Sequence, residues 1–175
     1  MTHPTNHDQM SARLKAAQST GDWPLLIRLC RQALRKQGRH RMAHRLLGFA
    51  LHQIGDTEAA LTAYKQGAAF WPQDAELLIN YANLLMGQAR NAEALPLLEK
   101  VVALRPDHSV CWSKLAQCCY PLSLHQKGFD ASQRALAWAA GDIQYLDATN
   151  QSAIHRRELG QVHEAVLDCK QAIAA

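Results

Sequence analysis

The sequence lacks the features that mark membrane-spanning, secreted and catalytic proteins. No apolar run approaches the ~18 residues of a transmembrane helix, and the polar residues 1–10 do not resemble a secretory signal. A glycine-rich phosphate loop, Gly-x-Ser-x-Gly and His-Glu-x-x-His are all absent, and the carboxylates are too scattered to define an acid–base pair. We therefore expect a non-catalytic cytoplasmic protein with no catalytic residue, no cofactor and no membrane contact.

Disulfide and metal chemistry have little support either. The five cysteines form no Cys-x-x-Cys pair and show no zinc-ligand spacing, and free buried thiols are typical of a reducing compartment. His40 and His44 are four residues apart, as two metal ligands on a helix can be. No carboxylate or cysteine near them completes a site, so we expect no metal centre.

The charge of the chain does not indicate a nucleic-acid partner. Net charge is +4, and mild basicity alone does not imply nucleic-acid binding. A basic run extends from Arg35 to Arg45, but no aromatic side chains interleave it for stacking on bases. A solvated basic edge accounts for the run, and nucleic acid is not expected as a partner.

The chain does contain a repeat of 34 residues. Trp71-Pro72-Gln73-Asp74 recurs one interval later as Arg105-Pro106-Asp107-His108, and Gly21-Asp22 recurs as Gly55-Asp56. Self-similarity at this period indicates an array of helical repeats. The outer units are atypical, with a small insertion near residues 141–148. The rows that follow from this period are 7–40, 41–74, 75–108, 109–142 and 146–175.

Each row predicts two helices joined by a tight turn. Large apolar residues three and four apart form one helix face, and Gly48 or Ala82 beside that face lets a second helix approach closely. Gly55-Asp56 ends the first helix and caps the second, and Pro72 ends the second helix because proline cannot donate the backbone bond. In the first row the helices are expected at residues 9–18 and 25–34.

These columns resemble the tetratricopeptide repeat over nearly the whole chain. The row that carries the resemblance best reads His44, Leu47, Gly48, Leu51, Ala60, Tyr64, Gly67 and Pro72. The resemblance implies an all-α fold, a right-handed helical solenoid of about four to five tandem helix pairs. It also implies one domain over residues 1–175.

In that family the first helix of each repeat lines a concave groove that binds peptides or partner helices. Carried onto this chain residue by residue, the resemblance implies a peptide-binding surface made of Met42, Arg45, Leu46, Phe49, His52, Ile79, Asn80, Asn83, Met86, Lys114, Gln117 and Tyr120. The apolar members predict a partner with apolar anchors. The alternative is that Phe49 and Ile79 pack between neighbouring first helices and never meet a ligand. Arg45, Asn80 and Lys114 also match three of five positions of the subtype that clamps acidic chaperone tails.

The first hypothesis for function is therefore a non-catalytic adaptor, scaffold or chaperone, and the apolar groove resembles chaperones of bacterial type III secretion translocators. The second is the N-terminal targeting module of a larger enzyme similar to O-linked N-acetylglucosamine transferases. A third possibility is a homo-oligomer formed through the C-terminal end, around Val162, Val166 and Ile173.

Overall fold

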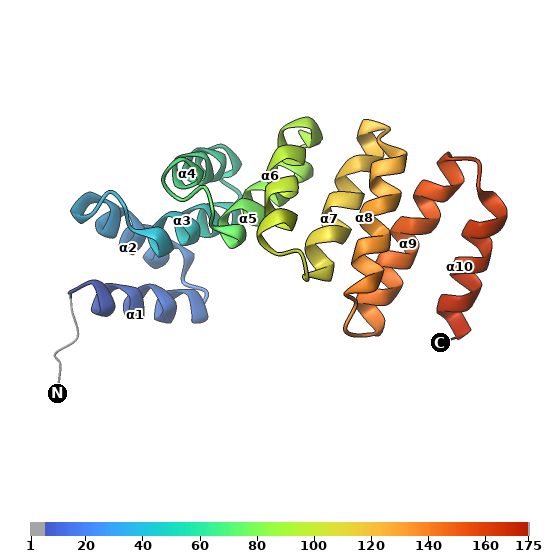
Figure 1. The fold of residues 1–175 in the computed structure, drawn as a ribbon. Coiled ribbons are helices and arrows are strands. Elements are labelled where there is room, and N and C mark those ends of the chain that lie inside the picture. Colours follow the sequence, from blue (N-terminus) through green and yellow to red (C-terminus); the bar gives the residue numbers. More distant parts are fainter. Residues whose placement is uncertain (1–5, 175) are drawn as a thin grey trace. The chain divides into compact units, whose positions relative to one another are not determined.

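The computed structural model describes residues 6–174, and over that range the chain is all-α, with no β-strand, as predicted. The helices follow one another along the chain as short antiparallel rods (Figure 1). Their bounds are α1 (Asn6–Ser19), α2 (Trp23–Lys36), α3 (Arg41–Gln53), α4 (Thr57–Phe70), α5 (Ala75–Gly87), α6 (Asn91–Leu104), α7 (Ser109–Cys119), the 3-10 turn η1 (Tyr120–Leu122), α8 (His125–Ala137), α9 (Asp142–Glu158) and α10 (Val162–Ala174).

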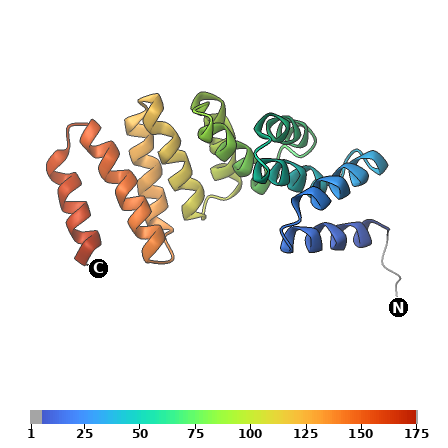
Figure 2. The same ribbon diagram turned by 180° about the vertical axis from the view of Figure 1, so that it is seen from behind.

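The helices form two compact units, Met1–Leu84 and Leu85–Ala175, with the division inside α5. In the first unit, α2 packs on α1 and α3, and α3 packs on α4. In the second unit, α7 packs on α6 and α8, and α9 packs on α8 and α10. Both views place α9 between α8 and α10 (Figures 1 and 2). The prediction of one domain over the whole chain stays a prediction.

The turns inside the repeats form as the sequence predicts. Gly55 ends α3 with a φ of +81°, a left-handed conformation that glycine adopts at no steric cost. The next residue, Asp56, caps α4, because its carboxylate accepts a hydrogen bond from the Ala59 N–H at 3.2 Å. Asp22 caps α2 in the same way through the Leu25 N–H at 2.9 Å.

The 34-residue period appears directly in the starts of the second helices. α2, α4, α6 and α8 begin at residues 23, 57, 91 and 125, whereas α10 begins at residue 162, three residues later than the period requires. The extra residues lengthen the preceding first helix, since α9 has 17 residues and α3 has 13. The insertion predicted near residues 141–148 is therefore additional helix at the N-terminus of α9.

Small residues set the distance between paired helices. An ideal Cβ added to Gly48 on α3 would lie 2.6 Å from the ring of Tyr64 on α4, so only glycine allows this approach. Tyr64 is fully buried there, and the burial raises the pKa of its phenol, with the charge of Arg45 opposing that rise. This close approach fixes α3, the helix that carries five of the predicted site residues.

Candidate functional site

Five of the predicted groove residues line one hollow in the first unit, between α3 and the adjoining part of α5. The hollow has a volume of about 270 Å³, below the ~300–1,000 Å³ of most small-molecule pockets. The residues around it are Gln18, Arg45, Leu46, Phe49, Glu76, Ile79 and Asn80.

The apolar wall of the hollow is partly core and partly surface. Leu46 is only 3% exposed and belongs to the packed interior. Phe49 is half-buried, and its ring meets the ring of Trp23 edge-on, with centroids 5.6 Å apart. Ile79 is also half-buried. Phe49 and Ile79 thus both contribute apolar surface to the hollow, and Phe49 also packs against Trp23 of α2.

The polar rim of the hollow is charge-neutral. Arg45 on α3 forms an ion pair with Glu76 on α5. A cation that is already paired attracts an anionic ligand less than a free one does. Asn80 and Gln18 add amide groups that can both donate and accept hydrogen bonds. The rim therefore offers neutral amide groups beside one ion pair.

Three other predicted residues of α3 and α5 lie outside this set. Met42 is half-buried, while His52 and Asn83 are exposed. None of the three is among the residues that line the hollow. These residues therefore lie on the same two helices as the hollow without lining it.

The remaining predicted residues belong to the second unit. Met86 is half-buried at the end of α5, and Lys114 on α7 donates a hydrogen bond from Nζ to Oε1 of Gln117 at 3.2 Å. Tyr120 lies in η1 and is partly exposed, but its ring faces inward to His125 and His155 at centroid distances of 5.9 and 6.1 Å. Lys114 and Gln117 are thus brought together, whereas Tyr120 joins a histidine cluster.

That histidine cluster was missed by the sequence reasoning. His155 on α9 is fully buried, and its Nε2 donates to the backbone carbonyl of Ala116 at 3.0 Å. Its ring fills the space above Gly128, where a Cβ would lie 2.2 Å away. Burial lowers the pKa of His155, and nearby His125 lowers it further, whereas the hydrogen bond that His155 donates to the Ala116 carbonyl raises it. The neutral imidazole of His155 therefore fills the contact between α9 and Gly128 of α8.

The two histidines considered as metal ligands serve the backbone instead. His40 caps α3, since its Nδ1 accepts a hydrogen bond from the Ala43 N–H at 3.3 Å. His44 donates from Nε2 to the Gly38 carbonyl at 2.9 Å. Over the part of the chain that the structure describes, no group of three or more His, Cys, Asp or Glu residues could hold a metal ion.

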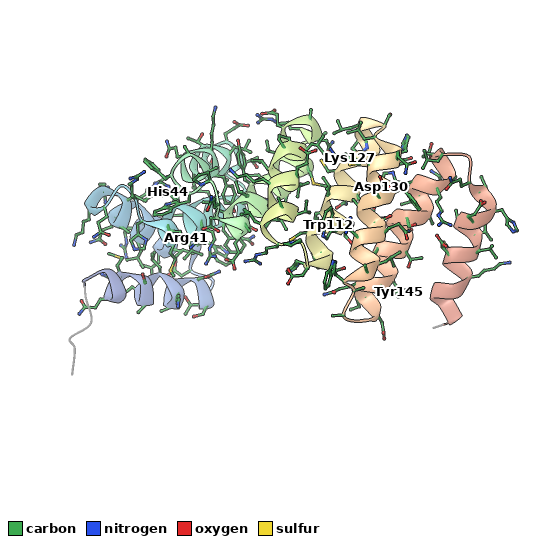
Figure 3. The ribbon with its side chains drawn as sticks, viewed as in Figure 1. Arg41, His44, Trp112, Lys127, Asp130 and Tyr145 are labelled. Atoms are coloured by element: carbon green, nitrogen blue, oxygen red, sulfur yellow. The ribbon has the colours of Figure 1, made fainter. Side chains whose placement is uncertain are left out.

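A second hollow, of about 410 Å³, lies at the junction between α4 and α5 in the first unit. Arg41, labelled in Figure 3, donates from Nε to Asp74 at 2.7 Å, and Asp74 also accepts from the Leu77 N–H at 3.1 Å. Burial raises the pKa of Asp74, but the bonds from Arg41 and Leu77 lower it more, so the carboxylate stays ionised. These bonds make the Trp71–Asp74 motif a structural junction between repeats.

Most of the cysteines are packed in the interior. Four of the five are buried and all are free thiols. Burial raises the pKa of Cys30 to about 12 and that of Cys119 to about 11, so both stay protonated at neutral pH.

No helix in the described residues is long and apolar enough to cross a membrane.

Comparison with known families decides what these helix pairs are. Two tetratricopeptide repeat models match, one over residues 12–75 and the other over residues 51–118. The chain belongs to the tetratricopeptide repeat family. Together the two matches run from residue 12 to residue 118, more than half of the chain, and they make it a protein-interaction scaffold module with a helical solenoid fold. No curated protein sequence matches the chain significantly.

Solved structures share the fold closely at low sequence identity. A crystal structure of MamA protein is 17% identical, with a TM-score of 0.84, over 96% of this chain and 90% of that one. MamA 41-end from Desulfovibrio magneticus RS-1 is also 17% identical, with a TM-score of 0.84, over 98% of this chain and 96% of that one. At this identity the likeness shows the fold alone.

Proposed function

We propose that the first-helix surface of the first unit binds a peptide segment of a protein partner, with one apolar side chain of that segment seated in the hollow between α3 and α5. The observation that carries this proposal is that five of the residues implied by the family resemblance line the same hollow. The family's use as a protein-interaction scaffold supports a protein rather than a small molecule as the ligand. In this role the chain acts as an adaptor or a chaperone.

The chemistry of the hollow defines the expected ligand. Phe49 and Ile79 offer half-buried apolar walls for a Leu, Ile, Met or Phe anchor. Asn80 and Gln18 can bond the backbone on either side of that anchor. Because Arg45 is paired with Glu76, the hollow itself supplies no unpaired cation to such a ligand. Affinity should therefore depend on apolar contact and change little with salt.

The experiment is a selection of peptides from a random display library on the full chain, followed by titration of the winners against variants. Ile79→Ala should weaken binding by about tenfold, because the variant removes apolar contact from the wall. The matched control is Ile54→Ala, an exposed isoleucine of the same unit outside the hollow. Equal affinity for both variants would reject the site.

Salt separates this proposal from the acidic-tail alternative. If binding needs a carboxylate-rich peptide and falls steeply between about 0.05 and 0.5 M salt, the ligand is anionic and the hollow is not its principal contact. Salt-insensitive binding of apolar winners supports the proposal.

A further inference from the structure

The positive charge of the chain is concentrated in the first unit. Residues 1–84 contain ten Lys and Arg side chains and six Asp and Glu side chains, which accounts for the entire net charge of +4. Seven of those ten cations stand between Asp22 and Asp56, a stretch without a single acidic residue. A block of one charge raises the local concentration of partners of the opposite charge. The first unit therefore offers a surface for an anionic partner.

Three cations of this stretch are exposed and unpaired. Arg35 and Lys36 stand in the last turn of α2, and Arg39 lies in the loop before α3. None of the three forms an ion pair with another of the described residues. Arg41 differs from them, because its Nε bonds to Asp74. The three unpaired side chains are therefore the ones that keep their charge available to a ligand.

These cations adjoin the second hollow, of about 410 Å³. Its walls include Trp71 and Phe70, which is 41% exposed, and the Arg39 guanidinium lies 5.5 Å over the Phe70 ring. The indole Nε1 of Trp71 is buried and has no acceptor among the described residues. Asp74, the acid among the lining residues, is only 3% exposed and bonded to Arg41, so it opposes an anion little. We call the three unpaired cations and this hollow the basic junction.

We propose that the basic junction binds an acidic segment of a partner protein, with one apolar side chain of that segment in the hollow and its carboxylates against the unpaired cations. Carboxylates match the charge of the three side chains, and guanidinium groups bind them with charge-assisted hydrogen bonds. The cations extend from the hollow to the last turn of α2. An extended segment therefore meets all three, whereas a small anion confined to the hollow does not.

The basic junction is separate from the proposed peptide site. None of its residues lines the hollow between α3 and α5, and none is a groove position that the family resemblance implies. This inference therefore goes beyond the proposed function and does not depend on it.

Nucleic acid fits the basic junction less well than a peptide does. Binding of single strands uses open aromatic faces on which bases stack. The Phe70 ring already contacts the Arg39 guanidinium and the His44 ring, whose centroid lies 5.3 Å away. Trp71 is half-buried. The tetratricopeptide repeat family also supports a protein as the partner.

A second copy of this chain does not supply such a segment either, since no two acidic residues are adjacent in the sequence. The homo-oligomer expected around Val162, Val166 and Ile173 thus stays a separate prediction, and the Ile173 side chain is outside the described residues.

The test is a titration of the full chain with two labelled peptides, one in which glutamates flank a central leucine and one in which glutamines replace those glutamates. The glutamate peptide should bind and should lose affinity steeply between about 0.05 and 0.5 M salt. Arg39→Glu should weaken its binding at least about tenfold, because the variant replaces a cation beside the hollow with an anion. Trp71 should report binding as a shift of its indole N–H signal in NMR spectra, assigned with Trp71→Phe.

Two further variants locate the site. Arg13→Glu, at an exposed residue of α1 outside the hollow, changes the net charge equally and is the matched control, with an expected effect below about twofold. Ile79→Ala alters the hollow between α3 and α5 and should leave the affinity for the glutamate peptide unchanged. Circular dichroism checks that all variants keep their helices.

Four outcomes overturn the proposal. The glutamate peptide fails to bind at the lowest salt, or the glutamine peptide binds equally well. Arg39→Glu and Arg13→Glu weaken binding to the same extent, which would mean that binding follows net charge and not a site. A single-stranded oligonucleotide binds more tightly than the glutamate peptide and loses that affinity in Arg39→Glu, which would assign the basic junction to nucleic acid.

Discussion

α8 and α10 hold the same place in successive repeats of one unit, yet within the described residues only α8 has a following helix packed against it. The covered face carries two groups that need specific partners, His125 and Gln133, and an aromatic ring under a guanidinium. At the positions of His125 and Phe129, α10 carries Val162 and Val166. A face made of simple apolar groups tolerates many registers and partners, whereas a polar face fixes one. The comparison shows that the repeat geometry supplies the contact and the side chains decide how specific it is.

The largest expected difference between the two faces is in their contribution to folding. Phe129→Ala should lower the free energy of unfolding by about 2 kcal/mol, roughly half of the ~3–5 kcal/mol lost from a fully buried ring. Val166→Ala should change it by less than about 0.5 kcal/mol in the monomer. Urea unfolding at low protein concentration measures both. Similar losses in the two variants would mean that α10 is covered within the chain.

The next largest expected effect is the loss of folding stability when a side chain is added at the close contact between α8 and α9. Gly128→Ala places a Cβ against the His155 ring, and the overpacking cost of ~1–3 kcal/mol outweighs a helix-propensity gain of up to ~1 kcal/mol. We expect a net loss of about 1 kcal/mol. Gly87→Ala, where a Cβ would meet nothing within 4 Å, is the control and should be neutral or stabilising. If the two variants have equal urea midpoints, the contact is looser than described.

The smallest expected effect is a dependence of folding stability on pH, which arises where His155 packs against α8. The pKa of His155 is lowered in the folded chain, so the unfolded chain binds the proton more readily. The stability that depends on neutral His155 is complete above the unfolded pKa of ~6.5 and is lost as pH falls through the lowered folded pKa. Between about pH 7.5 and pH 5.5, wild type should lose more stability than His155→Gln. Parallel losses would show that His155 does not carry the acid sensitivity.

Much of this fold could be predicted from the sequence because the repeat fixes local geometry. Gly55-Asp56 predicted a left-handed turn and a cap, and both are present. The 34-residue period predicted the helix starts, and the insertion predicted before α10 lengthens α9. These features depend on neighbours within a few residues of one another.

The site was only partly predictable, because exposure depends on contacts between repeats. Leu46 and Phe49 have the same apolar character in sequence, but Leu46 is core, whereas Phe49 is only half-buried and packs edge-on against Trp23. The pairing of Arg45 with Glu76 joins residues 31 positions apart, and the bond from His155 to Ala116 joins residues 39 apart. The one available signal for that bond was Gly128, which stands where the two preceding repeats carry Ala60 and Ala94.

Hydrogen exchange of the full chain with and without a selected apolar peptide tests the central claim most directly, because it locates the bound segment without altering the protein. The account predicts added protection in α3 and in residues 76–80 of α5, which contain the residues that line the hollow, with no change in α10. Protection confined to α2, or to α10, would contradict the assignment of the peptide site to the first-helix surface of the first unit.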